Sequence, residues 1–139
     1  MNIDSIQNGV VIDHITAGCG MKLYDLLGLD KLDCSVAIIK NVHSGKMGKK
    51  DIIKIDADIP IDFDVIGFVD PGVTLDFIKD GIRVDKKNVD LPEKLKGVIK
   101  CHNPRCITST EQELPHVFKL TDREKKIYRC IYCETKANI

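Results

Sequence analysis

Two closely spaced cysteine pairs near the C-terminus constrain this chain more than any other feature of its sequence. Cys101 and Cys106 enclose four residues, Cys130 and Cys133 enclose two, and 23 residues separate the pairs. Two turns with this spacing can present four thiolates to one tetrahedral ion, for which zinc is the natural occupant. Four thiolates leave no open position for a reactive water, so the pattern predicts one structural zinc ion and no hydrolytic centre.

The spacing leaves two alternatives open for this cluster. His102 or His116 could replace one cysteine as a ligand, or the four cysteines could form disulfides or remain free thiols. Cys19 and Cys34 lack metal-ligand spacing and are predicted to be buried core thiols. Roughly 45 residues with few large apolar side chains surround the pairs, so metal binding is expected to supply folding free energy.

The composition is that of an ordinary globular protein. Hydrophobic residues make up 43% of the 139 residues and charged residues 30%, which is too apolar for a disordered chain. The 21 lysines and arginines equal the 21 aspartates and glutamates, which argues against nucleic-acid binding. No targeting segment and no apolar run long enough for a membrane span is present, so we expect a cytoplasmic protein without a membrane partner.

The first ninety residues carry the pattern of a mixed α and β domain. Residues 62–70 fit either a strand or a second helix. The other predicted elements are a strand at 9–15, a helix at 20–27 ended by Gly28, a hairpin of strands at 34–42 and 51–56, and a second hairpin at 73–78 and 81–85. This order predicts the α+β class, with a ferredoxin-like open α/β sandwich followed by a small β-rich zinc ribbon holding four cysteines.

A domain boundary is expected just before the first cysteine pair. The segment LPEKLK at 91–96 contains the helix-breaking Pro92 and leads directly into that pair. We therefore place the boundary between residues 89 and 96, with domains at 1–92 and 93–139.

Several segments, taken in order, resemble the regulatory chain of aspartate carbamoyltransferase. They are VIDHI at 11–15, SGKMGKKDIIKI at 44–55, LPE at 91–93, CHNPRCI at 101–107 and CIYCE at 130–134. The resemblance runs from about residue 3 to residue 134. It implies a non-catalytic protein of pyrimidine biosynthesis, with an N-terminal allosteric domain binding nucleoside triphosphates and a zinc domain docking on the catalytic chain. CTP and UTP are the expected inhibitors and ATP the expected activator. A homodimer within a larger hetero-oligomer is also implied.

The resemblance assigns a nucleotide pocket to the first domain. Asp13 and His14 match pocket residues, and a carboxylate can accept hydrogen bonds from a ribose or base while a histidine can donate to phosphate. Lys50 and Lys54 match basic pocket residues, and their spacing of four on a strand places both on one face. Lys86 matches a lysine that contacts phosphate. Without the resemblance, these residues would be interpreted as a solvated strand end and strand face.

Further pocket positions follow from the resemblance. Ile6 matches a pocket-wall residue, and Lys87 could substitute for Lys86. Asp76 stands where the family usually has asparagine, and its charge would repel a triphosphate unless a cation intervenes. Gly81 replaces a bulkier residue that can flank the base. The last two departures predict altered or weakened effector binding.

In the zinc domain, Asn103 and Glu134 match polar residues that face the catalytic chain, and Arg105 replaces a small polar residue. On the sequence alone, these residues would be interpreted as caps of the cysteine turns. The expected mechanism is allosteric: an effector binds one quaternary state better than the other and acts through a hinge near residue 92.

Two other classes of function are the alternatives. The first is a stand-alone zinc-ribbon protein that binds nucleic acid, which the zero net charge disfavours. The second is a small enzyme using Asp13, His14 and Cys34, whose spacing does not indicate a nucleophile beside a base.

Overall fold

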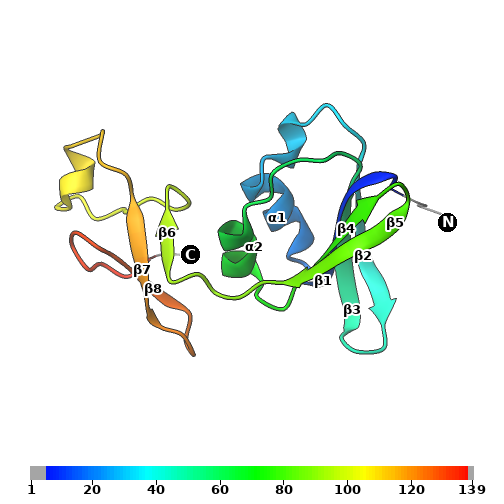
Figure 1. Cartoon of the computed structure of the whole chain (residues 1–139). Coiled ribbons are helices and arrows are strands. Elements are labelled where there is room, and N and C mark those ends of the chain that lie inside the picture. The colour runs from blue at the N-terminus through cyan, green and yellow to red at the C-terminus, as the bar shows by residue number, and fades with distance from the viewer. Residues whose placement is uncertain (1–5, 138–139) are drawn as a thin grey trace. The chain divides into compact units, whose positions relative to one another are not determined.

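The computed structural model describes residues 6–137, which form two compact units. The first unit extends to Asp90 and the second begins at Leu91 (Figure 1). No helix in the described part of the chain has the length and apolar character needed to cross a membrane.

The first unit is a five-stranded antiparallel sheet with two helices. Its strands are β1 (Asn8–Thr16), β2 (Val36–Ser44), β3 (Gly48–Ile55), β4 (Thr74–Lys79) and β5 (Ile82–Asn88), in the spatial order β2-β3-β1-β4-β5. Helix α1 (Gly20–Leu26) and a 3-10 turn (Leu29–Lys31) follow β1, and helix α2 (Phe63–Val69) follows β3. The first four strands have the ferredoxin-like order, and β5 extends the sheet beyond β4. The predicted α+β class is confirmed.

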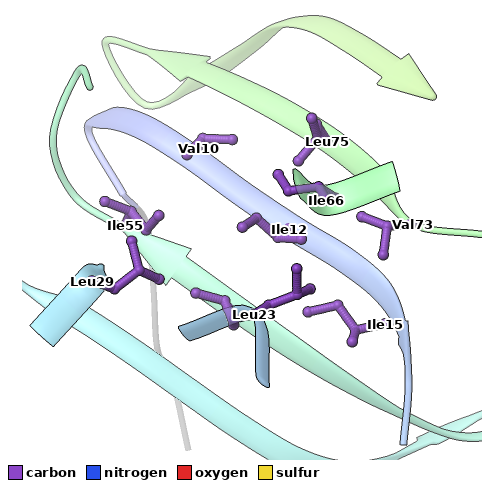
Figure 2. Packing of buried hydrophobic residues seen from close by; sticks show 10 residues of the cluster. Val10, Ile12, Ile15, Leu23, Leu29, Ile55, Ile66, Val73 and Leu75 are labelled. Carbon is purple, nitrogen blue, oxygen red and sulfur yellow. The ribbon is translucent and has the colours of Figure 1, made fainter. Parts of the chain in front are cut away.

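Both helices pack on one face of this sheet, where the core lies. Leu23 of α1 and Ile66 of α2 are fully buried and meet Ile12 of β1 and Leu75 of β4 (Figure 2). Burying each such side chain contributes on the order of 1.5–3 kcal/mol to the free energy of unfolding. Within residues 6–137, no helix packs on the opposite face of this sheet.

Residues 62–70, whose sequence fits a strand or a helix, contain helix α2. Asp62 caps it, because the Asp62 carboxylate accepts hydrogen bonds from the backbone N–H groups of Asp64 and Val65 at 3.1 and 3.2 Å. Gly67 is required by packing, since a Cβ atom there would lie 2.0 Å from the backbone oxygen of Asp90. The capping aspartate and this close approach explain why a segment of strand-like composition is helical.

Asp51 of β3 organises the loops at one end of the sheet. Its fully buried carboxylate accepts hydrogen bonds from the backbone N–H groups of Gly18 and Gly20 through Oδ2 and of Asn41 through Oδ1, each at 3.0 Å. Burial opposes ionisation, but these three donors outweigh it and hold the pKa of Asp51 below its usual range. One carboxylate therefore joins the start of α1 to a bulge in β2.

The second unit is a small three-stranded sheet, as the sequence predicts. Strands β6 (Lys94–Lys96), β7 (Val117–Asp122) and β8 (Ile127–Cys130) pair in that order, and a 3-10 turn (Ile107–Ser109) precedes β7. Its buried residues are Leu91, Pro92, Leu95, Cys106, Thr108, Phe118, Tyr128 and Cys130. The Tyr128 hydroxyl donates to the backbone oxygen of Pro92 at 2.7 Å. With so few apolar groups, hydrophobic burial alone gives this unit little stability.

Two predictions from the sequence need correction. Cys19 and Cys34 are predicted to be buried core thiols, but both are only partly buried at the edge of the core. Cys19 is the residue that precedes α1, and Cys34 lies in the loop before β2. Strand β3 begins at Gly48, three residues before the predicted start, because Gly48 pairs with Ser44 in a tight hairpin.

Candidate functional site

The four cysteines of the two pairs converge in the second unit. Their Sγ atoms all lie within 4.8 Å of one another, with 3.6 Å between Cys101 and Cys133 and 3.7 Å between Cys106 and Cys130. A disulfide needs about 2.05 Å, so these thiols are not oxidised to each other. Four sulfurs at about 2.3 Å from one zinc ion would be about 3.8 Å apart in a tetrahedron. The donor set and its spacing therefore fit one tetrahedral metal ion.

Neither histidine alternative belongs to this cluster. The metal-ligand grouping among the described residues contains the four cysteines and no histidine. His116 instead accepts a hydrogen bond at Nδ1 from the Cys101 backbone N–H at 3.1 Å, so it supports the first cysteine turn from outside. His102 is exposed.

Two threonine hydroxyl groups lie beside two of the four sulfurs. Thr108 Oγ1 donates to Cys106 Sγ at 3.1 Å, and Thr135 Oγ1 lies 3.2 Å from Cys133 Sγ. Burial raises the pKa of Cys101 to about 12, and the neighbouring thiols add to that effect. At Cys133 burial acts in the same direction, but hydrogen bonds from Thr135, Cys101 and Asn103 together outweigh it and lower the pKa of Cys133 to about 6. A bound cation would favour the thiolate form of all four.

Of the three expected interface residues, Asn103 joins the two cysteine turns. Asn103 Oδ1 accepts from the Arg105 backbone N–H at 3.0 Å, and Asn103 Nδ2 donates to Thr135 Oγ1 at 2.9 Å. Glu134 has a left-handed backbone with φ 62°, and its backbone oxygen accepts from Arg129 Nη1 at 3.1 Å. The side chains of Arg105 and Glu134 are exposed. Asn103 therefore has a clear structural role, and the partner-interface assignment of all three stays a prediction.

In the first unit, the expected nucleotide residues gather on the helix-free face of the sheet. Asp51 and Ile53 of β3 are buried against the helices, so the alternating Lys50 and Lys54 point to the other face. Lys50 Nζ lies 2.9 Å from Asp13 Oδ1. Burial opposes ionisation of Asp13, but the hydrogen bond from Lys50 and the His14 backbone N–H outweigh it and lower the pKa of Asp13. The Asp13 carboxyl is therefore ionised at neutral pH.

His14 occupies an irregular point in β1. Its φ is 59°, and the register of β1 against β3 shifts between Ile12 and Ile15. His14 Nδ1 lies 2.6 Å from Thr74 Oγ1. The bulge places His14 and Asp13 together at the end of the helix-free face beside Lys50.

A row of cross-strand neighbours extends this face across four strands. It consists of Lys54 on β3, Val11 on β1, Asp76 on β4 and Lys86 on β5, each directly opposite the next. Residues directly opposite one another share a face. The structure therefore brings Lys54, Asp76 and Lys86 onto the same face as Lys50 and Asp13.

Arg83 is a residue of this face that sequence reasoning missed. Its Nη1 atom lies 3.7 Å from Asp76 Oδ1, which supplies a cation beside the unexpected aspartate. Asp76 Oδ1 is buried and, within residues 6–137, accepts no hydrogen bond. The sequence does not indicate this contact, because Arg83 comes beside Asp76 through an irregularity in the pairing of β4 and β5.

The remaining pocket candidates lie near the start of β1. Ile6 is buried, with 8% of its surface exposed. Gly81 forms the β4–β5 turn with φ 77°, and its N–H donates to the backbone oxygen of Gln7 at 2.9 Å. The positive φ explains glycine at this position. The assignment of Ile6 to a pocket wall stays a prediction.

Comparison with known proteins covers nearly the whole chain. Residues 1–90 match the family model of the aspartate carbamoyltransferase regulatory chain, allosteric domain, and residues 93–139 match that of its metal binding domain. A regulatory chain of aspartate carbamoyltransferase from Clostridium tetani is 51% identical over 135 residues, covering 96% of this chain and 94% of the relative. One from Clostridium botulinum is 50% identical over 134 residues, covering 96% and 92%. One from Bifidobacterium longum is 44% identical over 139 residues, covering both chains completely.

Proposed function

This chain belongs to the family of aspartate carbamoyltransferase regulatory chains, and on that premise we propose that nucleoside triphosphates bind its first unit and act through its second unit on the catalytic chain. It is a non-catalytic subunit with an allosteric domain and a metal-binding domain. We assign nucleotide binding to residues 1–92 and docking to residues 93–139. The observation that carries the proposal is the gathering of lysines and carboxylates on the helix-free face of the first sheet.

Charge and reach support a triphosphate ligand on this face. Lys50 and Lys54 project from β3 and Lys86 projects from β5, so a polyphosphate lying across the sheet would meet ammonium groups along its length. Arg83 reduces the repulsion that Asp76 would otherwise exert on phosphate. CTP and UTP are proposed as inhibitors and ATP as activator.

The carboxylates of the face fit the other parts of a nucleotide. Asp76 Oδ1 is a buried acceptor without a hydrogen bond in the described part of the chain, which is costly unless a ligand donor reaches it. A ribose hydroxyl or a base amino group would supply that donor. Asp13 could accept in the same way, and His14 could donate to phosphate or ribose. Ile6 is proposed to contact the base.

We propose zinc as the metal held by Cys101, Cys106, Cys130 and Cys133. A closed set of four thiolates would fix the two cysteine turns and supply folding free energy without chemistry of its own. The turns carry Asn103, Arg105 and Glu134, which we propose contact the catalytic chain. An effector that binds one quaternary state more tightly would shift the equilibrium of the whole complex, and the linkage is reciprocal. A homodimer of this chain within that hetero-oligomer is part of the proposal.

Replacing Lys50 with methionine is expected to weaken binding of CTP and ATP by about 10- to 100-fold, because one charge-assisted contact with phosphate is lost and Asp13 is left unpaired. Calorimetric titration of the full chain measures this. The control is Lys49→Met, which removes an exposed lysine from the same strand on the other face of the sheet. Equal affinities of Lys50→Met, Lys49→Met and the wild-type chain would refute the proposed pocket.

A further inference from the structure

The two units carry opposite net charge although the whole chain is neutral. Residues 91–139 contain ten lysines and arginines against six aspartates and glutamates, whereas residues 1–90 contain eleven against fifteen. The second unit is therefore basic even though the net charge of the chain is +0. The positions of its cations decide whether this excess has a function.

Four of these cations form one cross-strand row. Lys94 of β6 lies opposite Lys119 of β7, Lys119 lies opposite Arg129 of β8, and Arg129 forms a bridge with Lys136. Residues directly opposite each other project from the same face of a sheet, so all four side chains share one face. We call these four residues the cationic row; strands β6, β7 and β8 that carry most of it are labelled in Figure 1.

This arrangement opposes the stability of the sheet. Neighbouring strands are about 4.8 Å apart, and like charges directly opposite each other destabilise the pair. All four residues are exposed, and none of the four forms an ion pair within residues 6–137. Arg129 is held by the backbone oxygen of Glu134 at 3.1 Å, which orients its guanidinium without neutralising it. An external anion would remove the repulsion.

The surroundings of the row indicate a protein ligand. Lys119 and Arg129 line a hollow of about 470 Å³ together with Thr121, Ile131 and Glu134. Ile131 is 46% exposed, so an apolar contact lies beside the cations, as in protein interfaces. The aromatic side chains of β7 and β8, Phe118 and Tyr128, are buried on the other face of the sheet, so these strands offer no platform on which bases could stack.

We propose that the cationic row is a docking surface for a carboxylate-bearing segment of the catalytic chain. This inference rests on the proposed function, because it names the surface through which the second unit meets its partner. On assembly, carboxylates of the catalytic chain would form ion pairs with the cations of the row. The repulsion among these cations in the free subunit would thereby be replaced by attraction to the partner. The free chain is less stable than a row of alternating charge would make it, which is the cost of this specificity.

The central test is Lys119→Glu, which places an anion between Lys94 and Arg129. The affinity of the zinc-loaded full chain for its catalytic chain is measured by calorimetry between about 0.01 and 0.15 M salt, where the Debye length falls from about 30 to 8 Å. We expect association to weaken at least about tenfold at low salt and to depend less steeply on salt. The midpoint temperature of unfolding of the free variant should rise by roughly 2–5 °C, because repulsion becomes attraction.

The matched control is Lys125→Glu, which makes the same charge change at an exposed lysine in the β7–β8 turn, outside the row. It should change affinity less than about threefold, as expected for an isolated surface charge. A raised unfolding temperature of Lys119→Glu would show that this variant is folded, so that its weaker binding comes from a lost contact and not from misfolding. A second variant, Lys119→Gln, should give an intermediate affinity.

Three outcomes would overturn the inference. If Lys119→Glu binds the catalytic chain as the wild type does, the row is not the docking surface, although the proposed function stands. If the wild-type chain does not bind the catalytic chain at all, the proposed function and this inference both fail. If the row variants instead lose binding to a DNA or RNA oligonucleotide or lose self-association, with catalytic-chain affinity unchanged, the row serves a different ligand.

Discussion

Replacing Cys106 with serine is expected to unfold residues 91–139 while the first unit stays folded. Cys106 is 2% exposed and is one of four sulfurs clustered within 4.8 Å. The small apolar core of this unit cannot compensate for the loss of a bound metal, whose apparent binding free energy is about 10–16 kcal/mol in comparable structural zinc sites. Chelation of the wild-type chain should have the same effect.

Limited proteolysis with mass spectrometry, together with zinc analysis, measures this result. We expect rapid cleavage after residue 91 and a resistant fragment corresponding to the first unit. Cys34→Ser is the control, because it removes a thiol that lies outside the cluster. That variant should retain zinc and resist cleavage. A metal-free second unit that remained resistant to protease would contradict the structural role of the site.

Replacing Asp51 with asparagine is expected to lower the free energy of unfolding of the first unit by about 2–4 kcal/mol. The Asp51 carboxylate accepts three backbone hydrogen bonds in a fully buried site, from Gly18, Gly20 and Asn41. An asparagine amide would point at least one N–H group toward a backbone donor and leave both unsatisfied. Chemical denaturation followed by circular dichroism measures the change.

The pH dependence of stability gives a second readout at Asp51. Its pKa is lowered in the folded chain, so its contribution is fully present above the unfolded value of about 3.9 and is lost as pH falls through the lower folded pKa. The Asp51→Asn variant should lack this part of the acid-induced decrease in the free energy of unfolding. Asp58→Asn, which changes an exposed aspartate in the loop after β3, is the control and should unfold as the wild type does. An Asp51→Asn chain as stable as the wild type would refute this account.

The cysteine cluster could be predicted from the sequence because short spacings fix the geometry of each turn locally. Two residues between Cys130 and Cys133 place both thiols on one tight turn, whatever the rest of the chain does. The strands at 9–15 and 73–78 were predictable for a similar reason, since their β-branched composition acts locally. The helix at 62–70 was ambiguous because its capping carboxylate and the close packing of Gly67 against Asp90 are set by tertiary contacts.

Features that depend on strand register could not be predicted. Lys94, Lys119, Arg129 and Lys136 are scattered along the sequence, and only the pairing of β6, β7 and β8 makes them neighbours. The contact between Arg83 and Asp76 depends in the same way on an irregularity in the β4–β5 pairing. Asp51 is one of many aspartates in the chain, and the residues around it in the sequence do not indicate that backbone N–H groups of two loops bind its carboxylate. The local sequence therefore indicates which types of residue a site contains. Which of these residues lie beside one another depends on strand register, which the local sequence does not determine.

The most direct test of the central account is an activity measurement on the complex of the zinc-loaded chain with its catalytic chain. Aspartate carbamoyltransferase activity would be followed at subsaturating aspartate with CTP, UTP, ATP or no nucleotide, before and after zinc chelation. The account expects co-elution of the two chains, lower activity with CTP, higher activity with ATP, and loss of both assembly and nucleotide response on chelation. Two chains that do not co-elute in the presence of zinc, or a complex whose activity no nucleotide changes, would contradict it.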